Sequence, residues 1–123
     1  MPLLNFDFAG PYAPDQAATW QFSDATWKDE NGNPVDMTGY TAKMQIRADH
    51  SPASSPYDVL TTGDGTIALG ANGVLSINVP AARTVRYSWG VGYYDFKVTS
   101  PTGIVTTLLA GRVMPNQAAT YPS

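Results

Sequence analysis

The chain has 123 residues, of which 43% are apolar and 14% carry a charge, and its formal net charge is −3. This length is typical of one domain that buries roughly two-thirds of its unfolded surface. The 7 Lys and Arg residues are scattered and no cysteine occurs, which argues against nucleic-acid binding and excludes disulfides and thiolate zinc sites.

Membrane insertion and export are not expected either. No stretch approaches the roughly 18 consecutive apolar residues of a membrane-spanning helix. The N-terminus, which begins Met1-Pro2-Leu3, lacks the basic region that opens a cleaved signal peptide. We therefore expect a protein that is made in the cytoplasm and has no membrane partner.

Frequent glycine, proline and β-branched residues, without a convincing amphipathic helix, predict an all-β fold. The spacing of short strands and turns favours an antiparallel β-sandwich, Ig-like or jelly-roll-like, with about 7–9 strands and little helix. We expect residues 1–123 to form a single domain. A short edge strand lies within about residues 1–10, and a C-terminal tail begins at about residue 115.

The first half of the chain contains three predicted strands. Residues 3–8 read as an edge strand ended by Gly10-Pro11, and residues 18–22 as a second strand with an irregularity at Ser23-Asp24. The third strand, from residue 40 to residue 47, shows strict period-two alternation, which indicates a central strand with one buried face. Its predicted inner residues are Tyr40, Ala42, Met44 and Ile46, and its outer residues are Thr41, Lys43, Gln45 and Arg47.

The second half continues the strand pattern. The pair Asn72-Gly73 suits a hairpin turn. Residues 80–86 suit one helical turn, too short to contribute much as a helix, and Gly111 suggests a bulge inside the last strand. Further strands are expected at residues 57–61, 66–69, 75–79, 93–100 and 104–114.

Two groups of residues suggest a binding site. Asp29, Asn31 and Asn33 are spaced like the start of a calcium loop, but no bidentate glutamate follows, so a polar hairpin turn is the better interpretation. Among the aromatic residues, Trp20 and Tyr94 are in phase with core positions. Trp89 and Tyr93 are not, and they predict a surface patch for either a glycan or a protein.

No catalytic set is apparent. His50, the single histidine, stands between Asp49 and Ser51 in one loop, whereas a hydrolytic triad converges from separate elements. The glycines at 90 and 92 lack the later glycine and the helix of a phosphate-binding loop. We therefore predict no enzyme activity, no catalytic residue, no cofactor and no metal.

The order of motifs between Trp20 and Met114 resembles the small β-sandwich proteins of tailed bacteriophages, similar to the N-terminal domains of upper-baseplate and tail proteins. The motifs that carry the resemblance are Asp36-Met37-Thr38-Gly39-Tyr40, Asp64-Gly65, Tyr94-Asp95-Phe96 and Leu109-Ala110-Gly111-Arg112-Val113. The resemblance implies a structural virion component of the tail or baseplate, a fibre-attachment adaptor or a capsid decoration protein.

From these observations we expect assembly with other virion proteins, as a homo-oligomer and within the virion. The alternative is a carbohydrate-binding module or a receptor-binding adhesin domain. An apolar edge strand and unplaced aromatic residues are features that partners contact. The predicted partner-contact residues are Leu4, Phe6, Phe8, Trp89, Tyr93 and Tyr121.

Overall fold

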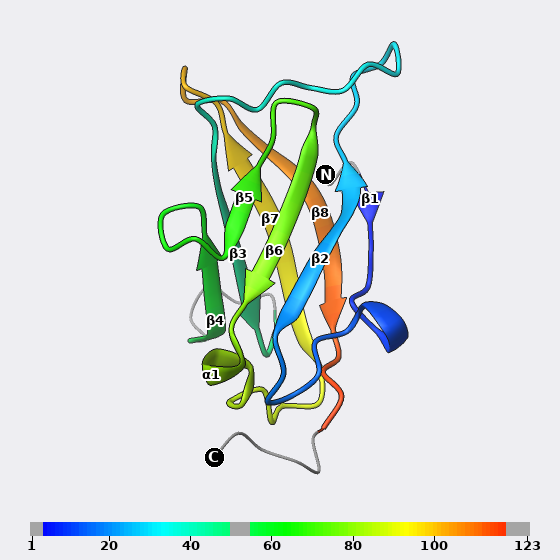
Figure 1. Cartoon of the computed structure of the whole chain (residues 1–123), viewed down its shortest axis with the longest axis vertical. Coiled ribbons are helices and arrows are strands. Elements are labelled where there is room, and N and C mark those ends of the chain that lie inside the picture. The colour runs from blue at the N-terminus through cyan, green and yellow to red at the C-terminus, as the bar shows by residue number, and fades with distance from the viewer. Residues whose placement is uncertain (1–3, 50–54, 118–123) are drawn as a thin grey trace.

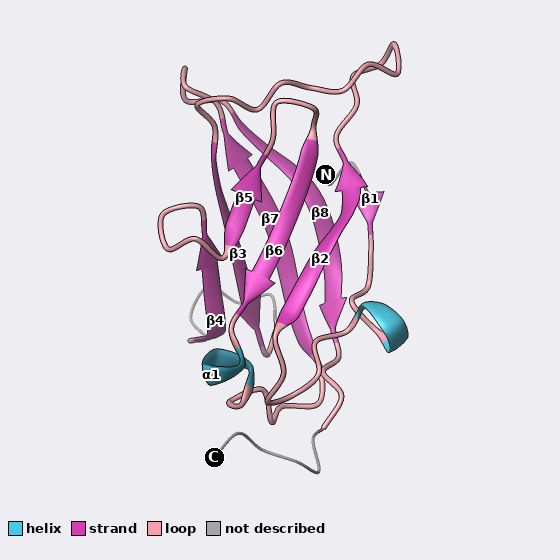
Figure 2. Cartoon of the chain, viewed as in Figure 1, coloured by secondary structure: helices cyan, strands magenta, loops and turns pink. Residues whose placement is uncertain are grey.

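The computed structural model describes residues 4–49 and 55–117 and shows two β-sheets packed face to face (Figure 1). Almost all regular structure in these residues is strand, with two short helices (Figure 2). An all-β sandwich with little helix is therefore confirmed. In chain order the elements are β1 (Leu4–Asn5), η1 (Gly10–Tyr12), β2 (Trp20–Thr26), β3 (Thr41–Arg47), β4 (Pro56–Thr61), β5 (Ile67–Leu69), β6 (Val74–Val79), α1 (Ala81–Thr84), β7 (Gly92–Thr99) and β8 (Val105–Val113).

The larger sheet has five strands in the order β1-β8-β7-β3-β4. Strand β3 lies inside it, with Met44 opposite Phe96 of β7 and Leu60 of β4. The predicted alternation is confirmed, because Met44 and Ile46 are fully buried whereas Lys43 is exposed. This sheet therefore has an apolar inner face and a polar outer face.

The smaller sheet, in the order β2-β6-β5, covers the inner face of the larger one (Figure 1). The predicted irregularity in β2 is confirmed, since its register against β6 shifts between Phe22 and Ala25. Strands β5 and β6 form a hairpin whose turn places Gly73 at a φ of 82°, a conformation that glycine adopts without steric cost. Strands β2 and β5 are the two edges of this sheet.

The prediction of a bulge at Gly111 is wrong. The extra residue in β8 is Leu108, where the register against β7 shifts, and consequently Leu108 and Leu109 are both buried. Gly111 has a different role. A Cβ atom at this position would lie 2.2 Å from the carbonyl oxygen of Phe6, so glycine is what allows the N-terminal segment to approach β8.

The N-terminal segment forms the edge of the larger sheet, as predicted, although β1 pairs with β8 in parallel. Further along, the Phe8 amide donates to the Arg112 carbonyl oxygen at 2.8 Å. The Phe8 ring is completely buried, with its centroid 5.2 Å from that of Trp20 and 4.9 Å from that of Phe22. This segment therefore contributes to the core as well as to the sheet edge.

The start of the predicted C-terminal tail is anchored to the sandwich. Pro115 is buried. The Asn116 amide donates to the Pro14 carbonyl oxygen at 2.9 Å, and the Asn116 carbonyl oxygen accepts from the Gln16 amide at 2.8 Å. Residues 115–117 thus belong to the lower end of the sandwich, and the rest of the predicted tail, with Tyr121, lies outside the described residues.

The predicted core positions of Trp20 and Tyr94 are confirmed, with 3% of each side chain exposed. The Tyr94 hydroxyl donates to the Phe6 carbonyl oxygen at 2.6 Å, so this buried polar group has its partner. Burial raises the pKa of Tyr94, with a smaller contribution from the charge of Asp7. Tyr94 therefore fastens the N-terminal segment over the inner face of the larger sheet.

Candidate functional site

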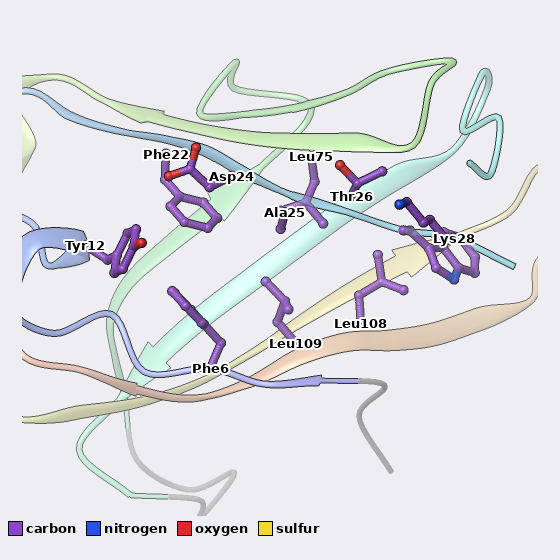
Figure 3. A pocket seen from close by; sticks show the side chains of 11 residues that line it. Phe6, Tyr12, Phe22, Asp24, Ala25, Thr26, Lys28, Leu75, Leu108 and Leu109 are labelled. Carbon is purple, nitrogen blue, oxygen red and sulfur yellow. The ribbon is translucent and has the colours of Figure 1, made fainter. Parts of the chain in front are cut away.

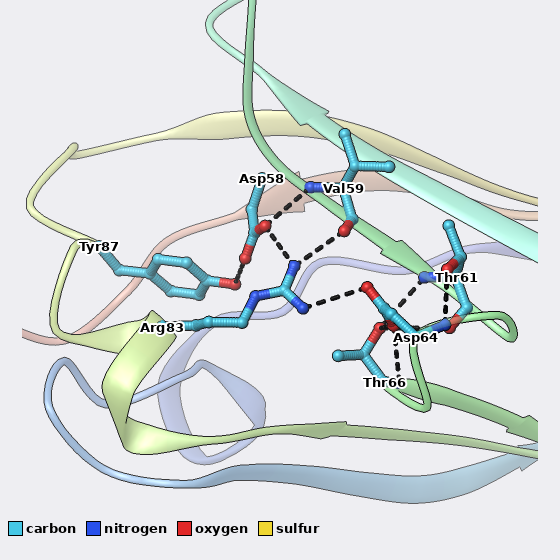
Figure 4. A network of polar contacts seen from close by, with 7 residues as sticks. All are labelled: Asp58, Val59, Thr61, Asp64, Thr66, Arg83 and Tyr87. Atoms are coloured by element: carbon cyan, nitrogen blue, oxygen red, sulfur yellow. Dashed lines mark hydrogen bonds and ion pairs between the residues drawn. The ribbon is translucent and has the colours of Figure 1, made fainter.

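A cluster of polar side chains joins β4 and the turn that follows it to α1 (Figure 4), and α1 lies at the lower end of the molecule (Figure 1). Arg83 on α1 donates to the Asp58 carboxylate and, at 2.8 Å, to the Val59 carbonyl oxygen. The Tyr87 hydroxyl donates to the other oxygen of Asp58 at 2.6 Å. A second nitrogen of Arg83 donates to Asp64 at 3.2 Å. Arg83, on the single turn of α1, therefore connects this helix to β4 and to the turn that follows β4.

The electrostatics of this cluster indicate a structural role. Burial, together with the hydrogen bond to Asp58, raises the pKa of Tyr87 above its ordinary value of 10.0. Burial acts to lower the pKa of Arg83, but its bonds to the two carboxylates outweigh that effect and raise it. Burial acts to raise the pKa of Asp64, yet the bonds from Thr66 and Arg83 leave it lowered. A general acid or base needs a pKa near the working pH, and these shifts lead away from it.

An aromatic pair lies close to this cluster in the chain. Trp89 stacks on Tyr57, with ring centroids 4.8 Å apart and planes 5° apart, and it also contacts Tyr87 at 5.2 Å. The Tyr57 side chain is 42% exposed, and Trp89 is half-buried. Sequence reasoning missed Tyr57, because the strand pattern that contains it gives no signal of a distant aromatic partner. Because the stack uses one face of each ring, Tyr57 and Trp89 can each offer at most one free ring face to a ligand.

An apolar crevice of about 550 Å³ opens between β2 and the side of the larger sheet formed by β1 and β8 (Figure 3). Asp24 and Lys28, both exposed, provide the charged part of its lining. Among the described strands, β1 and β2 have one neighbour each, so the crevice is flanked by two open strand edges. Its principal apolar lining residues are Phe6, Tyr12, Phe22, Trp27, Leu75 and Leu109.

The residues predicted to contact partners lie in different environments. Phe8 is removed from that set, because its ring is completely buried in the chain's own core. Phe6 is half-buried and lines the crevice, where it remains accessible. Tyr93 is half-buried on the outer face of the larger sheet. The backbone of Leu4 belongs to β1, and its side chain, like Tyr121, lies outside what the structure describes.

The calcium-like spacing belongs to a polar turn. The Asp29 carboxylate accepts hydrogen bonds from the amides of Asn31 at 2.9 Å and Asn33 at 3.0 Å, which is the turn geometry that aspartate favours. In residues 4–49 and 55–117, no three His, Cys, Asp or Glu side chains gather as a metal site would require. The same residues include no helix long and apolar enough to span a membrane. His50 lies outside the described residues.

No protein-family model and no curated protein matches this chain. Three surfaces of the molecule are candidates for function. These are the crevice between the sheet edges, the Tyr57–Trp89 pair and the outer face of the larger sheet.

Proposed function

We propose that this chain is a non-enzymatic structural component of a bacteriophage virion, in the tail or baseplate, in a fibre-attachment adaptor or in a capsid decoration, and that it assembles with other virion proteins. The observation that carries the proposal is the apolar crevice flanked by the open edges of β1 and β2. Such a site suits an extended protein segment, because strand edges offer backbone hydrogen bonds while the crevice receives side chains. The resemblance of the motif order to small tail and baseplate sandwiches supplies the virion context.

The crevice has unused apolar surface for a partner to cover. Phe6 and Trp27 are both half-buried and line it. Complete burial of one large apolar side chain contributes about 1.5–3 kcal/mol, so a partner that covers both rings gains a useful part of its binding free energy there. The bulge in β2 interrupts regular pairing beside the crevice, which leaves room for a side chain from the partner.

The test is incorporation into particles produced from the genome that encodes the chain. We expect mass spectrometry to detect the chain in gradient-purified particles. The variant Ala25→Trp fills the crevice, since Ala25 is half-buried in its lining, and it should be incorporated at a much lower level. Gln21→Trp is the matched control, because it adds the same ring at an exposed position of β2.

Melting temperatures of both variants separate a blocked crevice from a misfolded chain. Absence of the wild-type chain from particles contradicts the virion role. Incorporation of a folded Ala25→Trp chain at the wild-type level contradicts the use of the crevice.

One observation favours the alternative of a carbohydrate-binding module or receptor-binding adhesin. Sugar rings stack on exposed aromatic faces, and Tyr57 presents such a ring, held in place by Trp89. Under this alternative, titration with purified host-surface glycans gives saturable binding that is lost in Tyr57→Ala. The matched control is Tyr12→Ala, which removes a ring of similar exposure, 45%, from another part of the surface.

A further inference from the structure

The outer face of the larger sheet collects positive charge in a chain whose net charge is −3. The cross-strand register places Lys43 of β3 directly opposite Lys97 of β7, and places Arg47 and Arg112 on either side of Tyr93. Opposing residues share a face of a sheet. More than half of the 7 basic residues of the chain therefore lie on one face, which also carries Asp95, and Arg112 forms an ion pair with Asp7 at 3.0 Å.

The pair formed by Lys43 and Lys97 is unfavourable within the isolated chain. Directly opposite residues have Cβ atoms about 4.5–5.5 Å apart, and like charges at this spacing destabilise a sheet. Asp95 approaches the Lys97 ammonium at 3.9 Å, whereas none of the ion pairs among the described residues includes Lys43. An anionic group from outside would relieve this repulsion.

The two lysines line a shallow hollow of about 670 Å³ on the outer face. Threonine side chains form much of the remaining lining, which also includes Val105 and one acidic residue, Asp95, so the charged side chains of the hollow are two lysines and one aspartate. Val105 is 58% exposed and its neighbour Ile104 is 66% exposed, which is unusual for large apolar side chains. Neighbouring exposed aliphatic residues are a feature of protein-binding surfaces, and the charges of the hollow would select a partner of opposite charge.

The same chain carries a segment of opposite charge. Residues 28–36, here called the acidic turn, contain three exposed acidic residues, Asp29, Glu30 and Asp36, against a single lysine. The tip of the acidic turn protrudes at the upper right of the molecule, while the turn at residues 101–103, next to Ile104, lies at the upper left (Figure 1). The two features occupy opposite corners, so a second copy is better placed than the same copy to bring them together.

We propose that the acidic turn of one copy binds the hollow around Lys43 and Lys97 of a second copy, head to tail. Ile104 and Val105 then become covered at the rim. Such an interface uses different patches on the two copies, and repetition of it produces a ring or a filament according to the rotation between copies. This inference goes beyond the virion role and does not depend on it, since the hollow lies on the outer face of the larger sheet and shares no lining residue with the crevice.

The test exchanges charges between the two patches and measures assembly by analytical ultracentrifugation of the full chain. Wild type should self-associate with increasing concentration, and less strongly in about 500 mM than in about 50 mM salt. Lys43→Glu alone and Glu30→Lys alone should each weaken association roughly tenfold or more, because each creates a like-charge contact. An equimolar mixture of the two variants should recover association, as an assembly that contains the two variants in equal amounts, because each contact between unlike variants pairs opposite charges.

The matched control is the double variant Gln21→Glu/Ser88→Glu, which has the same net charge as Lys43→Glu but changes exposed positions elsewhere. It should associate like wild type. A monomeric wild type in low salt, or a Lys43→Glu chain that associates as wild type does, overturns the proposal. A monomeric wild type that binds a polyanion such as heparin through Lys43 also overturns it and reassigns the face to a polyanion.

Discussion

The two faces of the larger sheet are built from alternate residues of the same strands, yet their side chains differ in burial and in whether their neighbours are favourable. On the inner face Met44, Ile46 and Phe96 are fully buried beneath the smaller sheet, the N-terminal segment and Tyr87. On the outer face Lys43 lies opposite Lys97 with no cover among the described residues. The comparison indicates that the inner face specifies the fold, whereas the outer face keeps an unfavourable arrangement that a partner would relieve.

The largest effect should come from a charge placed on the inner face. Met44→Asp puts a carboxylate at a position with 0% exposure, and burying an unpaired charge costs several kcal/mol. That cost is comparable with the whole stability of a small domain, so the variant should be unfolded or nearly so. Thermal unfolding followed by circular dichroism measures it.

The adjacent variant Lys43→Asp is the control, because period two sends it to the outer face. We expect its melting temperature to stay close to that of wild type. Equal destabilisation of the two variants would mean that the two faces do not differ as described.

A second prediction concerns the part of the inner face that the N-terminal segment covers. Gly111→Ala places a Cβ atom against the Phe6 carbonyl oxygen and should destabilise the chain by about 1–3 kcal/mol through overpacking. Gly90→Ala is the matched control, because a Cβ there meets no atom within 4 Å. Chemical denaturation of both variants provides the comparison. Equal stabilities would show that the N-terminal segment does not press on β8.

The sequence predicts the strands and their buried faces better than it predicts the contacts that the N-terminal segment and α1 make with the larger sheet. Alternation gave the faces of β3 and β7, because period two is a local property of neighbouring residues. It did not reveal that Gly111 accommodates the backbone of Phe6, or that one turn of helix delivers Arg83 to Asp58. Both depend on contacts between distant parts of the chain.

The candidate surfaces show the same limit. Phe6 and Trp89 were recognised as residues of interest, whereas Tyr57 was not. The like-charge pair of Lys43 and Lys97 was also invisible, since it arises from the register between two strands and not from spacing within either one. The prediction that Phe8 contacts a partner follows from its place with Leu4 and Phe6 in an apolar edge strand, but the chain covers that residue itself.

A third prediction concerns Tyr87, which packs over the inner face of the larger sheet and donates a hydrogen bond to Asp58. Tyr87→Phe removes the hydrogen bond to Asp58 and should cost about 0.5–1.5 kcal/mol near neutral pH. Because the pKa of Tyr87 is raised in the folded chain, its contribution is fully present below the unfolded value of about 10 and is lost as the pH rises through the folded value. Wild type should therefore lose stability above about pH 10.

Melting curves from neutral pH to about pH 11 check this. The loss should be smaller in Tyr87→Phe and should not vanish, because the pKa of Tyr94 is raised as well. An alkaline dependence that is identical in the variant and in wild type would contradict the role given to Tyr87.

The smallest effect is expected on the outer face, and its sign is what matters. Lys43→Gln should stabilise the isolated chain by about 0.2–1 kcal/mol, because it removes a like-charge contact across two strands. The gain should be absent when Lys97→Gln is already present, and it should shrink in high salt, which screens exposed charges. A double-mutant cycle measured at low concentration, where the chain is monomeric, isolates this coupling from any change in assembly.

Lys28→Gln, on the acidic turn, is the control and should show no coupling to Lys97. A destabilising Lys43→Gln would mean that the two lysines do not repel each other, and the main physical reason for the outer face to seek an anionic partner would be lost.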